Sequence, residues 1–199
     1  IRTMKALIIV DVQYDFLPGG SLEVAKGDEI LPIINSIQKD YDLVVATQDW
    51  HPQDHLSFAS KYEGKLPFEV IDLDGLEQVL WPDHCVQESY GSQISEDLDS
   101  SRIEAIFRKG MDPRIDSYSG FYDNGKRKDT GLAGYLKARK IDEVHVCGLA
   151  ADFCVFFTAM DAISEGFKTS IISKATKAID KGAFMEKKNT FIQAGGSLI

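Results

Sequence analysis

The stretch EVHVCGLAADFCVFFTAMDAI, residues 143–163, joins a short β-branched run to a longer apolar one. The first run, Glu143–Cys147, does not alternate strictly between apolar and polar residues, which is typical of a strand buried on both faces. Residues from Phe153 to Ile163 are apolar on nearly every side, which predicts a buried helix. A buried strand that leads into a buried helix is the building unit of a parallel α/β sheet.

The same alternation continues along the rest of the chain. Further apolar runs predict strands at Ala6–Val10, Leu43–Thr47, Glu104–Phe107, Lys168–Ile172 and Ser197–Ile199. Segments with helical spacing lie between them, at 30–37, 132–140 and 181–194. Strands that alternate with helices predict one α/β domain over residues 1–199, with a mostly parallel sheet. Residues 49–103 interrupt this pattern with turns and polar residues, and loops of that length usually carry function.

Composition narrows the class of protein. The chain has 199 residues, 44% hydrophobic and 27% charged, the balance of a soluble globular protein. Its net charge of −9 disfavours nucleic acid as a partner, because nucleic-acid binding requires a basic face. No run has the length of a membrane span or the pattern of a secretory signal, so no membrane partner is expected. Three cysteines without a CxxC pair favour a reducing, cytoplasmic setting. Residues 1–3, ahead of Met4, are interpreted as a remnant outside the fold.

Reactive side chains follow several of the predicted strands. Asp11 comes directly after the first strand, Lys109 follows the third, and Cys154 lies shortly after the fourth. The carboxyl ends of parallel strands meet at one edge of a sheet, so these three side chains are expected to lie together. Cys154 falls in the first turn of the buried helix, with Asp152 as a candidate N-cap, and Asp11 could take the thiol proton. The alternative interpretation of Cys154 is a packed thiol, since free cysteines are often buried.

A second group of polar residues lies in the region 49–103. Asp49 and His51 are two residues apart on an extended segment, so their side chains can point to the same side. His55 and His84 follow in the same region. Carboxylate and imidazole ligands suit Zn²⁺, Fe²⁺ or Mn²⁺, and these residues therefore predict a metal site.

Other notable side chains have a structural explanation beside a functional one. Phe16 and Trp81 either fill the core or hold a flat heteroaromatic ring between them. His145 lies inside a predicted strand and is interpreted as structural. Cys85, next to His84, is interpreted as a packed thiol rather than a ligand.

Taken together, the motifs resemble the nicotinamidase family of isochorismatase-like cysteine hydrolases. The segments that carry the resemblance are DVQYDF at 11–16, DWHPQDHLSF at 49–58, WPDHCV at 81–86, RKG at 108–110 and GLAADFCV at 148–155. The segment DSYSGFYDN at 116–124 is similar to the longer bacterial members. The motifs follow family order from residue 4 nearly to the C-terminus, and the whole set is far more specific than any one of them.

The resemblance implies a three-layer α/β/α fold around a six-stranded parallel sheet. It implies an Asp11–Lys109–Cys154 triad that converts nicotinamide to nicotinic acid and ammonia through a thioester on Cys154, in NAD salvage, with pyrazinamide as a further substrate. A cis peptide bond is expected between Leu149 and Ala150, which would aim the amides of Ala150 and Cys154 into an oxyanion hole.

The resemblance also implies the residues that hold the substrate and a metal ion. The substrate-binding positions carry over onto Phe16, Trp81, Leu149 and Tyr122. The metal ligands carry over onto Asp49, His51 and His84, with His55 as a further candidate. One divalent ion is expected, with Zn²⁺ first and Fe²⁺ or Mn²⁺ as alternatives.

Several alternatives stay open at this point. Amidases that act on carbamoyl or ureido compounds share the triad but generally lack the Asp-x-His…His set, whereas isochorismatases proper usually lack the nucleophilic cysteine. A zinc hydrolase in which a metal-bound hydroxide attacks directly, and a binding module without catalysis, are rivals of other classes. Dinucleotide binding is disfavoured because no GxGxxG follows the first strand. The sequence does not decide whether the protein is a homo-oligomer.

Overall fold

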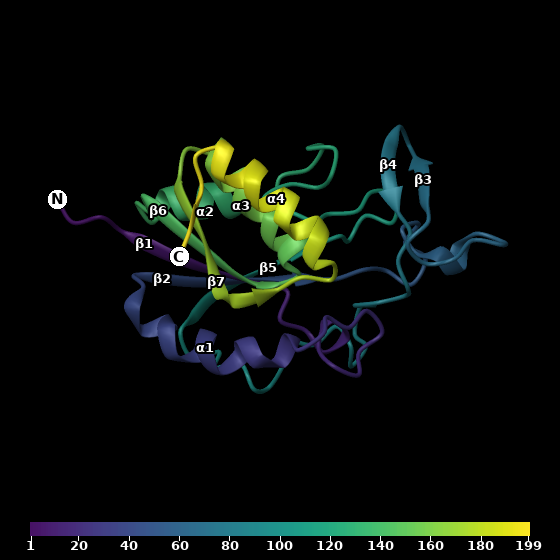
Figure 1. The fold of residues 1–199 in the computed structure, drawn as a ribbon, viewed down its shortest axis with the longest axis horizontal. Helices are drawn as coiled ribbons and strands as arrows, with labels where there is room; N and C mark the ends of the chain where they lie inside the picture. The colour runs from purple at the N-terminus through teal and green to yellow at the C-terminus, as the bar shows by residue number, and fades with distance from the viewer.

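The centre of the protein is a six-stranded sheet in which all neighbouring strands are parallel. In the computed structural model, which describes residues 1–199, the strand order is β5-β2-β1-β6-β7-β8 (Figure 1). The strands are β1 Lys5–Val10, β2 Leu43–Asp49, β5 Ile103–Lys109, β6 Glu143–Leu149, β7 Lys168–Lys177 and β8 Ser197–Leu198. The predicted parallel sheet is therefore confirmed, including its sixth strand at the C-terminus.

Helices cover both faces of this sheet. The α-helices are α1 Ile30–Ile37, α2 Leu132–Ala138, α3 Phe156–Ser164 and α4 Lys181–Gln193. Figure 1 shows α1 beneath the sheet and α2, α3 and α4 above it, which confirms the three-layer architecture. None of these helices combines the length and the apolar character that crossing a membrane requires.

Strand β1 is buried on both faces, as its unbroken apolar run predicts. Its side chains alternate between two hydrophobic cores. Ile8 and Val10 belong to the core under α2 and α3, whereas Leu7 and Ile9 belong to the core over α1. All four side chains are at most 1% exposed, so the strand is anchored from both sides. This rigid strand carries the first predicted catalytic residue at its end.

Strand β7 is longer than the apolar run Lys168–Ile172 predicts, because it continues to Lys177. Ser173 and Lys174 interrupt the pattern, and both are exposed in the structure. The pairing of β7 with β6 shifts register in the same region. The register shift thus places exposed polar residues within β7, and they interrupt the apolar pattern from which the end of the strand was predicted.

Residues 49–103 contain a β-hairpin that was not predicted. It consists of β3 Val70–Leu73 and β4 Leu76–Val79, joined by Asp74 and Gly75, which both have positive φ angles. An Asp-Gly pair between two strands is a strong hairpin signal, because it fits the two-residue turn that matches strand twist. Four-residue strands with one exposed face give only a weak hydrophobic pattern, so the turn was the only usable signal.

The strand order places a crevice between the ends of β1 and β6. On one side of this point, β1 is followed outward by β2 and β5. On the other side, β6 is followed by β7 and β8. In such sheets, ligands bind outside the carboxyl ends of the strands where the order reverses. Asp11 follows β1 directly and Ala150 follows β6 directly, so both residues lie at this point.

Replacing Gly148 by alanine is expected to destabilise the fold severely. Gly148 has φ +109°, and a Cβ there would overlap the backbone of its register partner Val10. Strain and overlap together predict a loss of about 3 kcal/mol or more in the free energy of unfolding, measured by denaturant titration. Gly134→Ala, in helix α2 where a Cβ would meet nothing within 4 Å, is the control and should gain about 1 kcal/mol. Equal stabilities of the two variants would contradict the assigned close approach of β1 and β6.

Candidate active site

The structure brings together the three residues of the predicted triad, which come from three different elements. Asp11 follows β1, Lys109 ends β5, and Cys154 lies in a single turn of π-helix, Ala151–Val155, that connects β6 to α3. Lys109 Nζ lies 2.8 Å from Asp11 Oδ2 and 3.4 Å from Cys154 Sγ. All three residues are buried, with at most 7% of any of them exposed. The expected meeting of acid, amine and thiol at one edge of the sheet is therefore found.

Lys109 also contacts a second carboxylate. Its Nζ lies 2.6 Å from Asp49 Oδ1 and donates to the carbonyl oxygen of Ser117 at 2.9 Å. Burial opposes the charge on Lys109, but Asp11 and Asp49 outweigh it and hold the pKa of Lys109 well above its ordinary value. Burial likewise opposes the charge on Asp49, yet Lys109 and His51 hold the pKa of Asp49 well below its ordinary value. One ammonium thus links two buried carboxylates.

The thiol and its expected base are both less acidic than usual. Burial raises the pKa of the Cys154 thiol well above its ordinary value, although Lys109 partly offsets this effect. Burial also raises the pKa of Asp11, again opposed by Lys109. The Thr47 hydroxyl donates to Asp11 Oδ1 at 2.7 Å and holds the carboxylate in place. A protonated thiol beside a carboxylate with raised proton affinity is a pair suited to proton transfer.

The turn around Cys154 differs from the prediction in one respect. Asp152 does not cap the helix, because its two carboxylate oxygens accept hydrogen bonds from the amides of Ile179 and Asp180, both at 2.9 Å. The candidate N-cap is therefore wrong: Asp152 joins the turn to the segment between β7 and α4. The peptide bond between Leu149 and Ala150 is cis, as the resemblance implied.

A cleft with mostly apolar walls opens in front of Cys154. Its walls are formed by Phe16, Leu22, Asp49, Trp81, His84, Asp116, Tyr118, Ala150, Phe153, Cys154 and Ile179. Of the expected substrate-binding residues, Phe16 and Trp81 line this cleft. Leu149 is fully buried and does not line it, and the hydroxyl of Tyr122 points elsewhere, donating to Glu165 at 2.5 Å.

Five wall residues had not been identified as site residues from the sequence: Leu22, Asp116, Tyr118, Phe153 and Ile179. Tyr118 is partly buried, and its hydroxyl accepts a hydrogen bond from Trp81 Nε1 at 3.3 Å. Phe153 meets the Trp81 ring edge-on at 4.9 Å. Asp116 brings a carboxylate that is 3% exposed. Tyr118 and Asp116 lie in the segment 116–124 already noted for its resemblance to longer family members, which was the one signal that could have found them.

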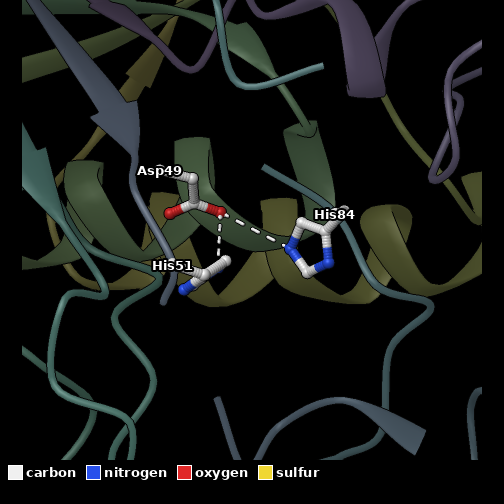
Figure 2. Close-up of side chains that lie close together, drawn as sticks. All are labelled: Asp49, His51 and His84. Atoms are coloured by element: carbon white, nitrogen blue, oxygen red, sulfur yellow. Dashed lines mark ion pairs between the residues drawn. The ribbon is translucent and has the colours of Figure 1, made fainter. Parts of the chain in front are cut away.

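Two of the predicted metal ligands, Asp49 and His84, line the polar end of the cleft, and the third, His51, contacts Asp49. Figure 2 shows one oxygen of the Asp49 carboxylate facing both His51 and His84, and this Oδ2 is 3.3 Å from His51 Nε2 and 3.7 Å from His84 Nε2. The ligand atoms of all three residues lie within 4.8 Å of one another. This carboxylate–imidazole–imidazole set fits a Zn²⁺-type ion.

Hydrogen bonds fix the tautomers of these two histidines. His51 Nδ1 donates to the carbonyl of Gly110 at 2.8 Å, and His84 Nδ1 donates to the carbonyl of Pro82 at 2.7 Å. A carbonyl can only accept, so the proton of the neutral ring is on Nδ1 and the Nε2 lone pair is free for a cation. His51 Nε2 is buried without a hydrogen-bond partner. Burial lowers the proton affinity of His51, but the Asp49 carboxylate outweighs this effect and raises the pKa of His51 to about 9. A cation that binds at Nε2 would therefore displace a proton.

His55 lies beside this set in the opposite tautomer. Its Nδ1 accepts a hydrogen bond from the amide of Ser57 at 3.1 Å, so the neutral ring carries its proton on Nε2. Burial lowers the pKa of His55 to about 4, which keeps the ring neutral. His51, His55 and Asp116 also have ligand atoms within 4.8 Å of one another. Of the two His51 ring nitrogens, only Nε2 has a free lone pair, so His51 can bind one ion. In this geometry the Nε2 of His55 carries a proton, so it is a hydrogen-bond donor and has no lone pair for a metal ion.

Comparison with known proteins shows the family to which the chain belongs. The isochorismatase domain model matches residues 5–199. A nicotinamidase of Acinetobacter baylyi is 49% identical over 181 residues, which cover 91% of this chain and 85% of that protein. The chain belongs to the isochorismatase family, and its sequence relatives with 44–49% identity are nicotinamidases.

Solved structures show the same fold. The nicotinamidase and pyrazinamidase of Acinetobacter baumanii has a TM-score of 0.96 and 47% identity, covering 100% of this chain and 96% of that one. A pyrazinamidase of Pyrococcus horikoshii, solved in complex with zinc, has a TM-score of 0.80 and 33% identity over 98% of both chains. The isochorismatase-like fold class is therefore confirmed.

Proposed function

We propose that this protein is a nicotinamidase, which hydrolyses nicotinamide to nicotinic acid and ammonia in NAD salvage and also accepts pyrazinamide. Its class, an amide hydrolase, follows from the nicotinamidase relatives. The observation that carries the mechanism is the position of Lys109 Nζ, which contacts both the Asp11 carboxylate and Cys154 Sγ at the base of an aromatic cleft. We assign this activity to one domain in a reducing, cytoplasmic setting.

The reaction begins with proton transfer from Cys154 to Asp11. The thiolate forms a bond to the carboxamide carbon, and the amides of Ala150 and Cys154 donate to the negative oxygen that develops. When the carbon–nitrogen bond breaks, Asp11 returns the proton to the leaving nitrogen, so ammonia departs and a thioester remains on Cys154. Asp11 then takes a proton from water, whose oxygen attacks the thioester. Nicotinic acid leaves and Cys154 regains its proton.

The walls of the cleft hold the substrate during these steps. Phe16 and Trp81 would enclose the flat pyridine ring, and Tyr118 fixes the orientation of Trp81 through its hydroxyl. Asp49, His51 and His84 would hold one divalent cation, with Zn²⁺ expected first and Fe²⁺ or Mn²⁺ as alternatives. When bound, the ion supplies a Lewis acid at the polar end of the cleft, where it can orient a ring nitrogen.

The proposal is tested by measuring ammonia release from nicotinamide by metal-replete protein. Release supports the assignment, and release from pyrazinamide would extend it to that ring. If nicotinamide is not hydrolysed while carbamoyl or ureido compounds are, the protein is an amidase of the same fold with another substrate.

Removing the metal is expected to weaken substrate binding. Treatment with a chelator should raise KM for nicotinamide by roughly tenfold or more, because the ring loses its partner at the polar end of the cleft. Adding back Zn²⁺, Mn²⁺ or Fe²⁺ one at a time, with metal content measured for each, identifies which ion restores KM. Unchanged affinity in metal-free protein would show that the ion does not contact the substrate.

The dependence of the reaction on pH should report the Asp11 carboxylate. Asp11 acts as a base only when ionised, so kcat/KM rises with pH through its pKa, which burial raises above the ordinary value of 3.8. The Thr47 hydroxyl lowers this pKa, so Thr47→Val should move the acid limb to higher pH. The profile is measured for both proteins from about pH 4 to pH 8. An acid limb that stays in place in Thr47→Val would exclude Asp11 as the titrating base.

A further inference from the structure

One wall of the substrate cleft contacts a charged side chain of the last helix. The wall is Phe153, which meets the Trp81 ring edge-on at 4.9 Å and the Tyr118 ring at 5.4 Å. Lys187, on α4, places its Nζ over the Phe153 ring, 4.1 Å from the ring centroid. The same ammonium lies 5.2 Å from the centroid of Phe157 on α3.

The ammonium of Lys187 has a second partner in the same turn. It donates a hydrogen bond to the backbone carbonyl of Asp152, the residue directly before Phe153. Lys187 is only partly exposed, so this charge is shielded from water and its contacts with the ring are strengthened. Both contacts act on the turn that also carries Cys154, one on its backbone and one on its aromatic side chain.

Helix α4 is independently fixed relative to this turn. The Asp152 carboxylate accepts hydrogen bonds from the amides of Ile179 and Asp180, and Asp180 in turn caps α4 by accepting from the amide of Ala183 at 3.1 Å. The start of α4 is thus tied to the turn, and Lys187 contacts the turn from further along the same helix. An anchored helix can hold its lysine at a constant position above Phe153.

We propose that Lys187 is a positioning residue for substrate binding, which holds the Phe153 ring in place as a fixed wall of the cleft. The proposal rests on the proposed function, in which a flat heteroaromatic amide lies against this wall. Lys187 acts through Phe153 and Trp81 and has no part in the chemistry at Cys154. Loss of its ammonium should therefore affect binding of the ring far more than the rate of bond breaking.

The first test compares substitutions at two adjacent lysines of α4. Lys188 is a matched control, because it is also partly exposed and its Nζ lies 5.0 Å from the centroid of Phe184. Lys187→Met should raise KM for nicotinamide by about three- to tenfold, with kcat changed less than about twofold. Lys187→Arg should restore KM to within about twofold, since a guanidinium also stacks on an aromatic face. Lys188→Met should leave both constants unchanged, and equal effects of the two methionine variants would overturn the proposal.

A double-mutant cycle tests whether Lys187 acts through the ring. In a Phe153→Leu background the aromatic face is gone, so Lys187→Met should raise KM by less than about twofold. The full increase in that background would overturn the proposal, because Lys187 would then act through its bond to Asp152 alone.

A third measurement does not depend on turnover. Trp50 and Trp81 are the two tryptophans of the chain, so Trp50→Phe leaves Trp81, which is 3% exposed, as the single fluorophore. Releasing Phe153 should expose Trp81, so acrylamide quenching should increase in Lys187→Met and stay low in Lys187→Arg and Lys188→Met. Unchanged quenching in Lys187→Met would overturn the proposal even if nicotinamide is hydrolysed. Absence of nicotinamide hydrolysis by the parent protein would instead refute the proposed function, and the quenching comparison would still decide the role of Lys187.

Discussion

Cys154→Ala is expected to abolish ammonia release from nicotinamide, with kcat lower by about 10⁴-fold or more. The thiol is the only group in the cleft that would bond to the carboxamide carbon in the proposed mechanism. Neither Asp11 nor Lys109 can replace it, because they are paired with each other at 2.8 Å. The variant should retain its metal and its fold, since Sγ is outside the Asp49–His51–His84 set and the change removes a single atom.

Cys147→Ala is the matched control for this variant. Cys147 is also buried, and its Sγ donates a weak hydrogen bond to the carbonyl of Ile8 at 3.7 Å. We expect this variant to retain turnover with at most a modest loss of stability. Equal turnover by Cys154→Ala and the parent protein would contradict the thioester mechanism and favour direct attack by a metal-activated hydroxide.

Lys109→Met is expected to destabilise the protein by about 3–5 kcal/mol and to remove turnover. Lys109 balances the buried carboxylates of Asp11 and Asp49, at 2.8 and 2.6 Å, and methionine leaves two like charges without this partner. The free energy of unfolding is measured by denaturant titration at neutral pH, with divalent ions removed. Lys168→Met is the control, because the Lys168 side chain is exposed and its partner Glu143 keeps His145 as a second partner, so its loss should cost at most about 1 kcal/mol.

Removing one of the two carboxylates provides a second check. The double variant Lys109→Met/Asp11→Asn should recover part of the lost stability, because one buried charge is gone. Stability of Lys109→Met within about 1 kcal/mol of the parent would show that the two carboxylates are not both ionised at neutral pH.

The sequence was sufficient to predict the residues that a parallel sheet brings together. Asp11, Lys109 and Cys154 each follow a buried strand, and the register of parallel strands aligns their carboxyl ends whatever the loops between them do. Asp49 and His51 could be found for a related reason, since a spacing of two on an extended segment places both side chains on one side.

Residues that depend on loop or turn geometry were harder to predict. Phe153 is adjacent to Cys154, but only the π-helical turn determines that its ring faces Trp81. Asp152 resembled an N-cap because it precedes an apolar helix, whereas its partners come from the segment before α4. The tautomer of His55 depends on one backbone amide, that of Ser57, and no sequence pattern encodes that bond.

The two oxygens of Asp49 serve different partners. Oδ1 is bonded to Lys109, which touches Cys154, while Oδ2 faces His51 and His84. A cation bound at Oδ2 would draw electron density away from Oδ1 and so weaken the contact of Asp49 with Lys109. Because Lys109 also touches Cys154, binding of a cation and binding at the thiol would be thermodynamically linked. Linkage is reciprocal: a reversible inhibitor that binds at Cys154 must change the affinity for the cation by the same factor by which the cation changes the affinity for the inhibitor. The strength of an inhibitor aimed at this cysteine would therefore also depend on which cation Asp49, His51 and His84 hold.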